Sequence, residues 1–410
     1  MSGQPQPYVL DPTGRDIHAE AALVREHGPA TLVELPGGVT AWAIGRPDTL
    51  KALLTDPRVS KDPRRHWPRW IAGDVGPEWV LSTWVSVQNM FTAYGDEHRR
   101  LRSLVSRSFT ARRVHDLRPW VERICAGLLD DLAGAPPGEP ADVRARLASP
   151  LPVEVICQLM GIPDELRPGL RRVVDVIFDT SATPEEAGAN AVEMYQIMTE
   201  LVARKRHTPG DDLTSSLIAQ RDGDGSGLSE QEVVDTLLLM ISAGHETTVN
   251  LIDHALVALL THRDQLTLVR SGQVGWDAVI EEALRWQAPV ANVPLRFAVT
   301  DLVVGDVTIR AGEAILPAYA AAGRAPETHG ASADRFDVTR RSKEHLAFGH
   351  GVHFCLGAPL ARLEATVALP AFFTRFPDAT LAVHPAELTP LTSFISNGHV
   401  EVPVLLHGPR

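Results

Sequence analysis

The spacing of apolar and polar residues predicts where helices and strands lie along the chain. Residues 31–35 and 40–44 alternate between apolar and polar positions around Pro36-Gly37-Gly38, a pattern typical of a β-hairpin. From about residue 48 to residue 290 the apolar residues mostly recur at helical spacing. Strand patterns return between residues 293 and 319. The sum is a mainly α fold with a minor β portion.

A second hairpin is expected near the C-terminal end. Asn397-Gly398 is a favoured two-residue turn, and it separates residues 393–396 from residues 400–406.

One helical pattern is exceptionally long. Ser229 and Glu232 form an S-x-x-E capping box, and helical spacing then continues to about His262. At 1.5 Å per residue this is roughly 50 Å of helix. Its apolar middle, residues 237–243, suits burial in a core. Because no linker long enough to separate two domains is visible, we expect residues 1–410 to form a single domain.

Charge and cysteine usage exclude several classes of protein. With 39 Lys and Arg against 51 Asp and Glu, the net charge is −12, which argues against a nucleic-acid binder. The sequence contains no uninterrupted run of 18 apolar residues, so we expect no membrane-spanning helix. Three widely separated cysteines, Cys125, Cys157 and Cys355, argue against a disulfide framework, a structural zinc site and c-type haem attachment. Such usage suits a reducing cytoplasm, so we expect a cytoplasmic protein.

Cys355 lies in a glycine-rich loop just before a helical pattern at residues 361–371. A cysteine at a helix N-terminus is favoured as a thiolate by free backbone N–H groups and the helix dipole. Gly349, Gly351 and Gly357 allow the backbone to turn sharply and approach something flat and large, and Phe348 is placed to pack beneath it.

The centre of the long helical pattern reads Ala243-Gly244-His245-Glu246-Thr247-Thr248, which is poor in helix-forming residues. The Thr247 hydroxyl is expected to bond the Ala243 carbonyl and open the helix locally. Glu246 adds a titratable group beside Thr247, a plausible proton relay. A zinc-protease H-E-x-x-H motif is excluded because its second His would be Val249. The loop at residues 222–227 partly resembles a calcium loop, but its twelfth position is Val233 instead of Glu.

The loop F-x-x-G-x-H-x-C-x-G, here Phe348, Gly351, His353, Cys355 and Gly357, resembles the haem-binding loop of the cytochrome P450 family. The similarity runs nearly the whole length of the chain. Within the family it is greatest to actinomycete family 154, subfamily C, whose members hydroxylate steroids and macrolide precursors. Residues 58–62, 89–95 and 346–360 carry that closer similarity. The resemblance implies the P450 fold, a single triangular helical domain with a long central helix over the haem.

The resemblance also implies roles for individual residues. Cys355 is the thiolate ligand of haem b, whose electron density favours O–O cleavage, and Glu246 and Thr247 deliver protons. Glu282, Arg285 and the partner arginine Arg335 lock the region carrying the haem loop. The remaining haem contacts implied are His98, Arg102, Arg296, Phe348, His353 and Gly357. The chain departs from relatives at Gly323 and Ala325, where they usually carry Asn and Asp.

The implied reaction is hydroxylation of a bulky apolar substrate, a steroid first and a macrolactone or polyketide next, with O₂. No flavin or dinucleotide motif is present, so two electrons are expected from a ferredoxin and its reductase, and arginines in the acid-free stretch 99–113 suit an acidic partner. We expect a monomer. A peroxide-using or non-oxygenating haem protein remains the alternative.

Four tryptophans between residues 67 and 84 suit a large apolar ligand, although ordinary packing explains several of them equally well. The pocket positions that the resemblance implies are Trp84, Phe91, Phe178, Met240, Ala243, Val290, Leu295 and Phe394.

Overall fold

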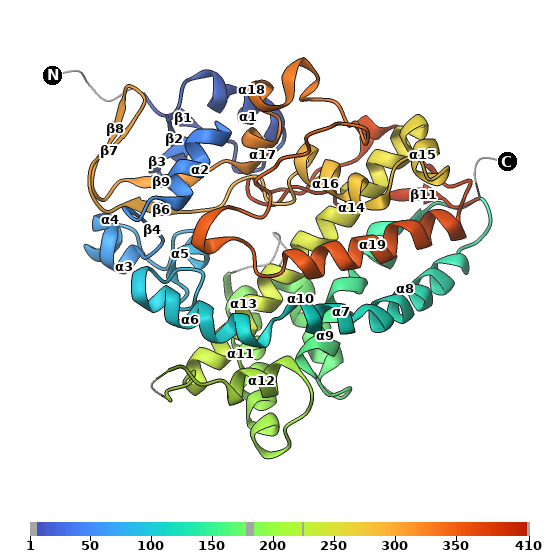
Figure 1. The fold of residues 1–410 in the computed structure, drawn as a ribbon, viewed down its shortest axis with the longest axis horizontal. Coiled ribbons are helices and arrows are strands. Elements are labelled where there is room, and N and C mark those ends of the chain that lie inside the picture. Colours follow the sequence, from blue (N-terminus) through green and yellow to red (C-terminus); the bar gives the residue numbers. More distant parts are fainter. Residues whose placement is uncertain (1–5, 178–183, 224, 408–410) are drawn as a thin grey trace. The chain divides into compact units, whose positions relative to one another are not determined.

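The computed structural model describes residues 6–177, 184–223 and 225–407 (Figure 1). Its contacts divide the chain into two compact units. Unit 1 comprises Met1–Gly95, Thr261–Cys355 and Thr389–Val400. Unit 2 comprises Asp96–Leu260, Leu356–Leu388 and Glu401–Arg410. Within the described residues, no helix is long and apolar enough to cross a membrane.

Unit 1 contains a six-stranded mixed sheet with the strand order β1-β2-β3-β9-β6-β4. Strands β2 and β3 form the predicted hairpin, with Thr31 opposite Ala43. The turn is possible because Gly37 and Gly38 adopt φ values of 80° and 69°. A separate hairpin joins β7 to β8. The strands are β1 (Tyr8–Val9), β2 (Thr31–Leu35), β3 (Val39–Ile44), β4 (Val59–Ser60), β6 (Arg296–Ala298), β7 (Leu302–Val304), β8 (Val307–Ile309) and β9 (Ala314–Pro317).

Unit 1 also contains a set of short helices. They are α1 (Ile17–Glu26), α2 (Pro47–Thr55), α3 (Pro63–His66), α4 (Pro68–Ile71), α5 (Thr83–Ser86), α15 (Arg263–Arg270), α16 (Trp276–Trp286), α17 (Tyr319–Gly323), α18 (Pro326–His329) and the 3-10 turns Gly330–Ser332 and Gly351–His353. Trp67 and Trp79 are buried in the core of unit 1, and Trp67 stacks on Phe297 with ring centroids 5.1 Å apart. Ordinary packing therefore explains these two tryptophans.

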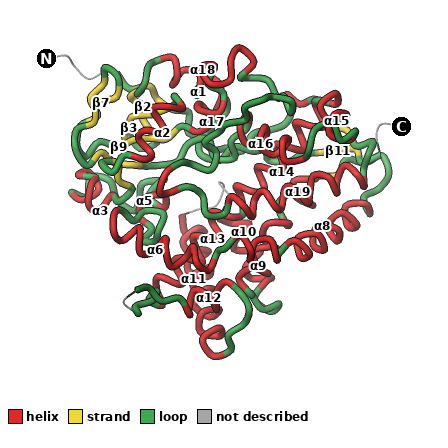
Figure 2. Tube along the Cα trace, viewed as in Figure 1, coloured by secondary structure: helices red, strands yellow, loops and turns green. Residues whose placement is uncertain are grey.

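Unit 2 is mainly helical. Helices also predominate over strands in the chain as a whole (Figure 2). Its helices are α6 (Gly95–Ser108), α7 (Ala111–Asp116), α8 (Arg118–Ala133), the π-helix η1 (Arg144–Ala148), α9 (Pro150–Met160), α10 (Arg167–Ile177), α11 (Pro184–His207), α12 (Leu213–Ala219), α13 (Glu230–Gly244), α14 (Glu246–Thr261), α19 (Ala358–Arg375) and the 3-10 turn Pro385–Glu387. Strands β5 (Ala141–Asp142), β10 (Thr380–Leu381) and β11 (Pro403–Leu405) form a small sheet in the order β10-β11-β5. The predicted mainly α fold with a minor β portion is confirmed.

The long helical pattern forms two consecutive helices. The predicted capping box at Ser229 and Glu232 is present at the start of α13. The helix is interrupted at His245, where ψ is −79°, and α14 begins at Glu246. The predicted helical pattern is therefore present, and the predicted local opening divides it into two helices. Gly244 and the Thr247 hydroxyl, which donates to the Ala243 carbonyl, explain where the interruption falls.

The predicted C-terminal hairpin does not form. Ser396 instead makes an isolated bridge to Val290, and the Asn397 side chain donates to the Ala288 carbonyl. Strand β11 pairs with β10 and β5. Local turn propensity at Asn397-Gly398 is outweighed because each flanking segment finds hydrogen-bond partners elsewhere in its own unit.

Candidate active site

The Cys355 loop presents an exposed thiol. Cys355 is exposed, whereas Cys125 and Cys157 are buried. Burial raises the pKa of the Cys125 thiol to about 11 and is the main cause that raises that of Cys157 to about 12. These two cysteines are therefore inert thiols, as predicted, and Cys355 is the cysteine available to a ligand.

Backbone geometry shapes the loop. Gly349 and Gly351 adopt φ values of 71° and 72°, which residues with a side chain rarely adopt. A Cβ atom on Gly351 would lie 2.6 Å from the Leu54 carbonyl oxygen of α2, so this glycine also permits a close approach. The Cys355 N–H donates to the Phe348 carbonyl at 2.8 Å. Helix α19 begins three residues after Cys355, close to its predicted start.

A buried ion pair lies at the end of α16 in the same unit. Arg285 and Glu282 have fully buried side chains, and their two parallel hydrogen bonds are both 2.8 Å long. The Arg285 guanidinium also donates to the carbonyl oxygens of Gly323, Ala333 and Arg335. Because every donor finds an acceptor, this pair joins α16 to the segment before the Cys355 loop.

The partner of this pair is not the predicted one. The second arginine whose side chain reaches Glu282 is Arg340, with Nε donating to Oε1 at 3.2 Å, whereas Arg335 contributes its carbonyl oxygen to Arg285. Sequence reasoning missed Arg340 because the arginine in the D-R-F segment appeared to match.

A Cβ atom on Gly323 would lie 2.2 Å from the Arg285 carbonyl oxygen, so the close packing at this position requires a glycine.

Two buried cations lie beside each other in unit 1. Arg296 is 5% exposed and hydrogen-bonds to the hydroxyl of Tyr319. Lys61 is 3% exposed, and its Nζ lies 3.5 Å from the centroid of the Phe91 ring. Burial, followed by repulsion from Arg296, lowers the pKa of Lys61 well below its ordinary value. Sequence reasoning selected Arg296 and missed Lys61, since a single lysine carries no motif.

The polar residues around the helix interruption lie in unit 2. Arg144 donates to Glu246 at 3.1 Å, to Asp253 at 2.8 Å and to Asn250 at 2.9 Å. Burial is the main cause that raises the pKa of Glu246, and Arg144 opposes this effect. Burial likewise lowers the pKa of His245 to about 4, so His245 is neutral at pH 7. Sequence reasoning missed Arg144, which no motif marks.

The remaining predicted haem contacts are distributed between the two units. His353 lies in unit 1, in the 3-10 turn before Cys355. His98 and Arg102 lie one turn apart on α6 of unit 2, where His98 is buried and Arg102 is half-buried. Gly357 precedes the first residue of α19.

The predicted pocket residues have mixed environments. Leu295 and Phe394 are buried in one apolar cluster of unit 1, against which Trp84 and Val290 pack. The rings of Trp84 and Phe91 lie 6.5 Å apart. Met240 is half-buried and Ala243 exposed, both on α13. Phe178 lies outside the described residues.

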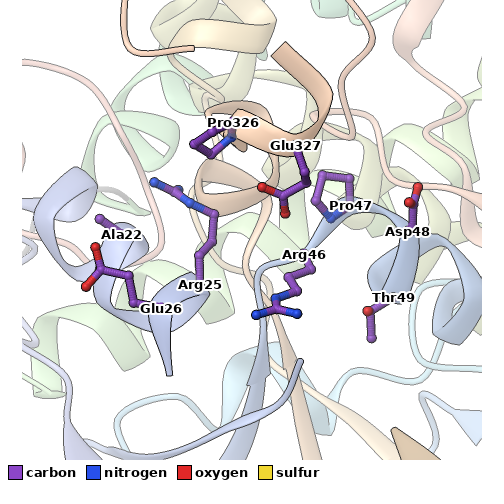
Figure 3. Close-up of a pocket in the computed structure, with 9 residues that line it drawn as sticks. All are labelled: Ala22, Arg25, Glu26, Arg46, Pro47, Asp48, Thr49, Pro326 and Glu327. Carbon is purple, nitrogen blue, oxygen red and sulfur yellow. The ribbon is translucent and has the colours of Figure 1, made fainter. Parts of the chain in front are cut away.

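A surface cavity of about 620 Å³ lies elsewhere in unit 1 (Figure 3). It is lined by Ala22, Arg25, Glu26, Arg46, Pro47, Asp48, Thr49, Pro326 and Glu327. None of the predicted site residues lines it, and its walls are largely charged. It does not match the apolar pocket that the predictions require.

Comparisons with known proteins identify the family. The model of the family "Cytochrome P450" matches residues 276–388. A 2-hydroxy-5-methyl-1-naphthoate 7-hydroxylase from Streptomyces carzinostaticus is 43% identical over 402 residues, covering 98% of both chains. Among solved structures, CYP154A1 from Streptomyces coelicolor is 56% identical with a TM-score of 0.90, covering 98% of this chain and 100% of that one. A testosterone-bound CYP154C4 from Streptomyces is 42% identical with a TM-score of 0.93, covering 98% and 99%.

The chain therefore belongs to the cytochrome P450 family and is a haem-dependent monooxygenase. The resemblance to P450s of family 154 is confirmed, and of these two structures the subfamily A protein shares more identity with the chain than the subfamily C protein.

The residues of unit 1 fit a haem group. A thiolate suits iron, and Cys355 is the exposed thiol, presented by a loop whose glycines keep side chains away from it. Haem also carries two carboxylates, and Arg296 is a buried cation that suits such a group.

Proposed function

We propose that this enzyme hydroxylates a bulky apolar molecule, a steroid or a macrolactone, with two electrons supplied by a ferredoxin and its reductase. Haem, when bound, supplies the reductive activation of O₂. The observation that carries the proposal is the chain's combination of an exposed cysteine in a glycine-shaped loop with a helix opened beside a buried carboxyl group and a hydroxyl.

Cys355 is the proposed iron ligand, and the other proposed haem contacts are His98, Arg102, Arg296, Phe348, His353 and Gly357. Supporting this, the two remaining cysteines are buried with raised pKa values and are poor thiolates at neutral pH.

Glu246 and Thr247 are the proposed proton-transfer residues. Burial raises the pKa of Glu246, whereas the positive charge of Arg144 stabilises its carboxylate. Because these two effects oppose each other, Glu246 is suited to gain and lose a proton. The Thr247 hydroxyl donates to Ala243 at 2.7 Å, so its oxygen stays free to accept a second hydrogen bond.

The apolar substrate class rests on the side chains at the predicted pocket positions. Trp84, Phe91, Val290, Leu295 and Phe394 carry no charge. Relatives include a 6-deoxyerythronolide B hydroxylase from Saccharopolyspora erythraea, 38% identical over 398 residues, and the testosterone-bound CYP154C4. These names support macrolactones and steroids as the first compounds to test.

A ferredoxin would dock on the arginines of α6 and α7. Arg99 pairs with Asp96 and Arg112 with Asp116, so part of this charge is neutralised. Arg107 is exposed, and among the described residues it donates to two uncharged oxygen atoms, the Arg221 carbonyl and the Ser103 hydroxyl. If the proposal is correct, R107E slows reduction by ferredoxin at low salt, and the difference from wild type narrows at high salt. We further propose that residues 1–410 work as one P450 domain in a cytoplasmic monomer.

Absorption spectroscopy tests the proposal. The reduced, carbon-monoxide-bound protein should show the Soret maximum of a thiolate-ligated haem, and an imidazole-type maximum would refute it. A steroid and a macrolactone are then compared by the spectral shift that each causes on binding. Turnover with peroxide alone, without reductant and O₂, would favour the peroxide-using alternative.

A further inference from the structure

Lys61 is a buried cation whose position is set by the sheet. Strand β4 pairs antiparallel with β6, with Ser60 opposite Phe297 and Val59 opposite Ala298. The next step of this register places Lys61 opposite Arg296. Lys61 is 3% exposed and Arg296 is 5% exposed, so both basic side chains are held out of solvent, close enough for Arg296 to disfavour the charged form of Lys61.

This arrangement lacks a compensating anion. Within the described residues, neither cation forms an ion pair with a carboxylate. The neighbouring acid, Asp62, accepts hydrogen bonds from the backbone and side chain of Arg64 instead. The Phe91 ring offers Lys61 a cation–π contact and Tyr319 offers Arg296 a neutral hydroxyl, and each replaces only part of the hydration that burial removes.

The cations also lie close to the loop of the proposed iron ligand. The Tyr319 hydroxyl bonds Arg296, and a Cβ atom on Gly349 would lie 3.5 Å from the same hydroxyl oxygen. Arg296, Tyr319 and the Cys355 loop therefore form one continuous neighbourhood within unit 1. Two unpaired cations at the edge of a ligand site favour a ligand that carries negative charge.

We propose that Lys61 and Arg296 together bind a carboxylate of a molecule held at the Cys355 loop, with Lys61 as the second cation. The carboxylate belongs either to a haem propionate or to a carboxyl group carried by an otherwise apolar substrate. The inference rests on the proposed function, because that function places haem and substrate at this loop. The inference adds Lys61 to the proposed function as a residue that determines specificity.

The test uses K61M, which keeps the length of the side chain and removes its charge. Thermal unfolding of the full chain is measured with and without haem. Because the proposal makes Lys61 favourable only when a carboxylate is present, K61M should leave the haem-free chain as stable as wild type or more stable. A structural role for Lys61 would lower both melting temperatures. A K61M chain that fails to fold would therefore also contradict the proposal.

Two measurements distinguish the source of the carboxylate. Haem loss is followed by transfer to apomyoglobin, and ligand binding by spectral titration with 2-naphthoate and its uncharged methyl ester. If the partner is a propionate, K61M loses haem about tenfold faster or more, with the preference for acid over ester unchanged. If the partner is a substrate, haem loss is unchanged, and the preference for the acid falls about tenfold.

K61R and K51M serve as controls. K61R keeps the charge and should retain most of the wild-type behaviour. Lys51 is more exposed and pairs with Glu344, so K51M should change neither haem loss nor the acid-to-ester ratio. If wild type takes up no haem, the proposed function fails. If wild type takes up haem and K61M behaves like K51M, only the present inference is refuted.

Discussion

Removal of Arg144 should destabilise unit 2 in a manner that depends on pH. The Arg144 guanidinium pairs with Glu246 and Asp253, and the three residues are 8%, 6% and 1% exposed. R144M keeps much of the apolar volume and removes the charge. Since breaking a buried ion pair by removing one partner costs about 3–5 kcal/mol, we expect a loss of about 4 kcal/mol in the free energy of unfolding at pH 8.

The sign of the pH dependence follows from Glu246. Burial already raises the pKa of Glu246 in the folded protein, and Arg144 opposes that effect, so R144M raises this pKa further. The folded state then binds more protons than the unfolded state, and stability falls as pH rises from the unfolded pKa to the folded one. The loss caused by R144M should therefore be smaller at pH 5.5 than at pH 8.

Urea unfolding of the haem-loaded protein, followed by circular dichroism at both pH values, measures this effect. R146M is the matched control, because Arg146 lies on the same π-helix and donates to the Asp131 carbonyl. We expect R146M to lose less than about 1 kcal/mol. Equal losses in the two variants, or a greater loss for R144M at pH 5.5, would refute the reasoning.

Further substitutions test the proposed site. C355A should abolish the thiolate-type Soret maximum of the reduced, carbon-monoxide-bound protein and all oxygenation, and full activity would rule out the ligand assignment. T247A should raise the release of peroxide several-fold relative to product. An unchanged ratio of peroxide to product in T247A and also in the double variant T247A/T248A would exclude Thr247 from proton transfer. R285M should cost about 3–5 kcal/mol in the free energy of unfolding. R340M should cost less, because Arg285 is fully buried and bonds Glu282 twice at 2.8 Å, whereas the Arg340 side chain is 8% exposed and bonds Glu282 once at 3.2 Å. Urea unfolding of both variants in parallel checks the order.

The two predicted hairpins show how far local patterns extend. The hairpin of β2 and β3 was predictable because Gly37 and Gly38 permit the turn and adjacent strands pair with each other. The same reasoning at Asn397-Gly398 was wrong, since Ser396 bridges to Val290 and β11 pairs with β10 and β5. The propensity of two residues to form a turn therefore does not decide the structure when the segments on either side form backbone hydrogen bonds with other parts of the chain.

The sequence by itself determined the cysteine loop, the capping box of α13 and the weak point of the helix at Ala243–Thr247. Each depends on residues within a few positions of one another, where spacing and backbone geometry are sufficient. Only the tertiary structure decided which charges pair: Arg144 with Glu246 across 102 residues, Arg340 with Glu282 across 58, and Lys61 beside Arg296. A buried charge pairs with whichever group the packing of the chain brings within hydrogen-bond distance. The separation of two residues along the sequence does not predict such a pair.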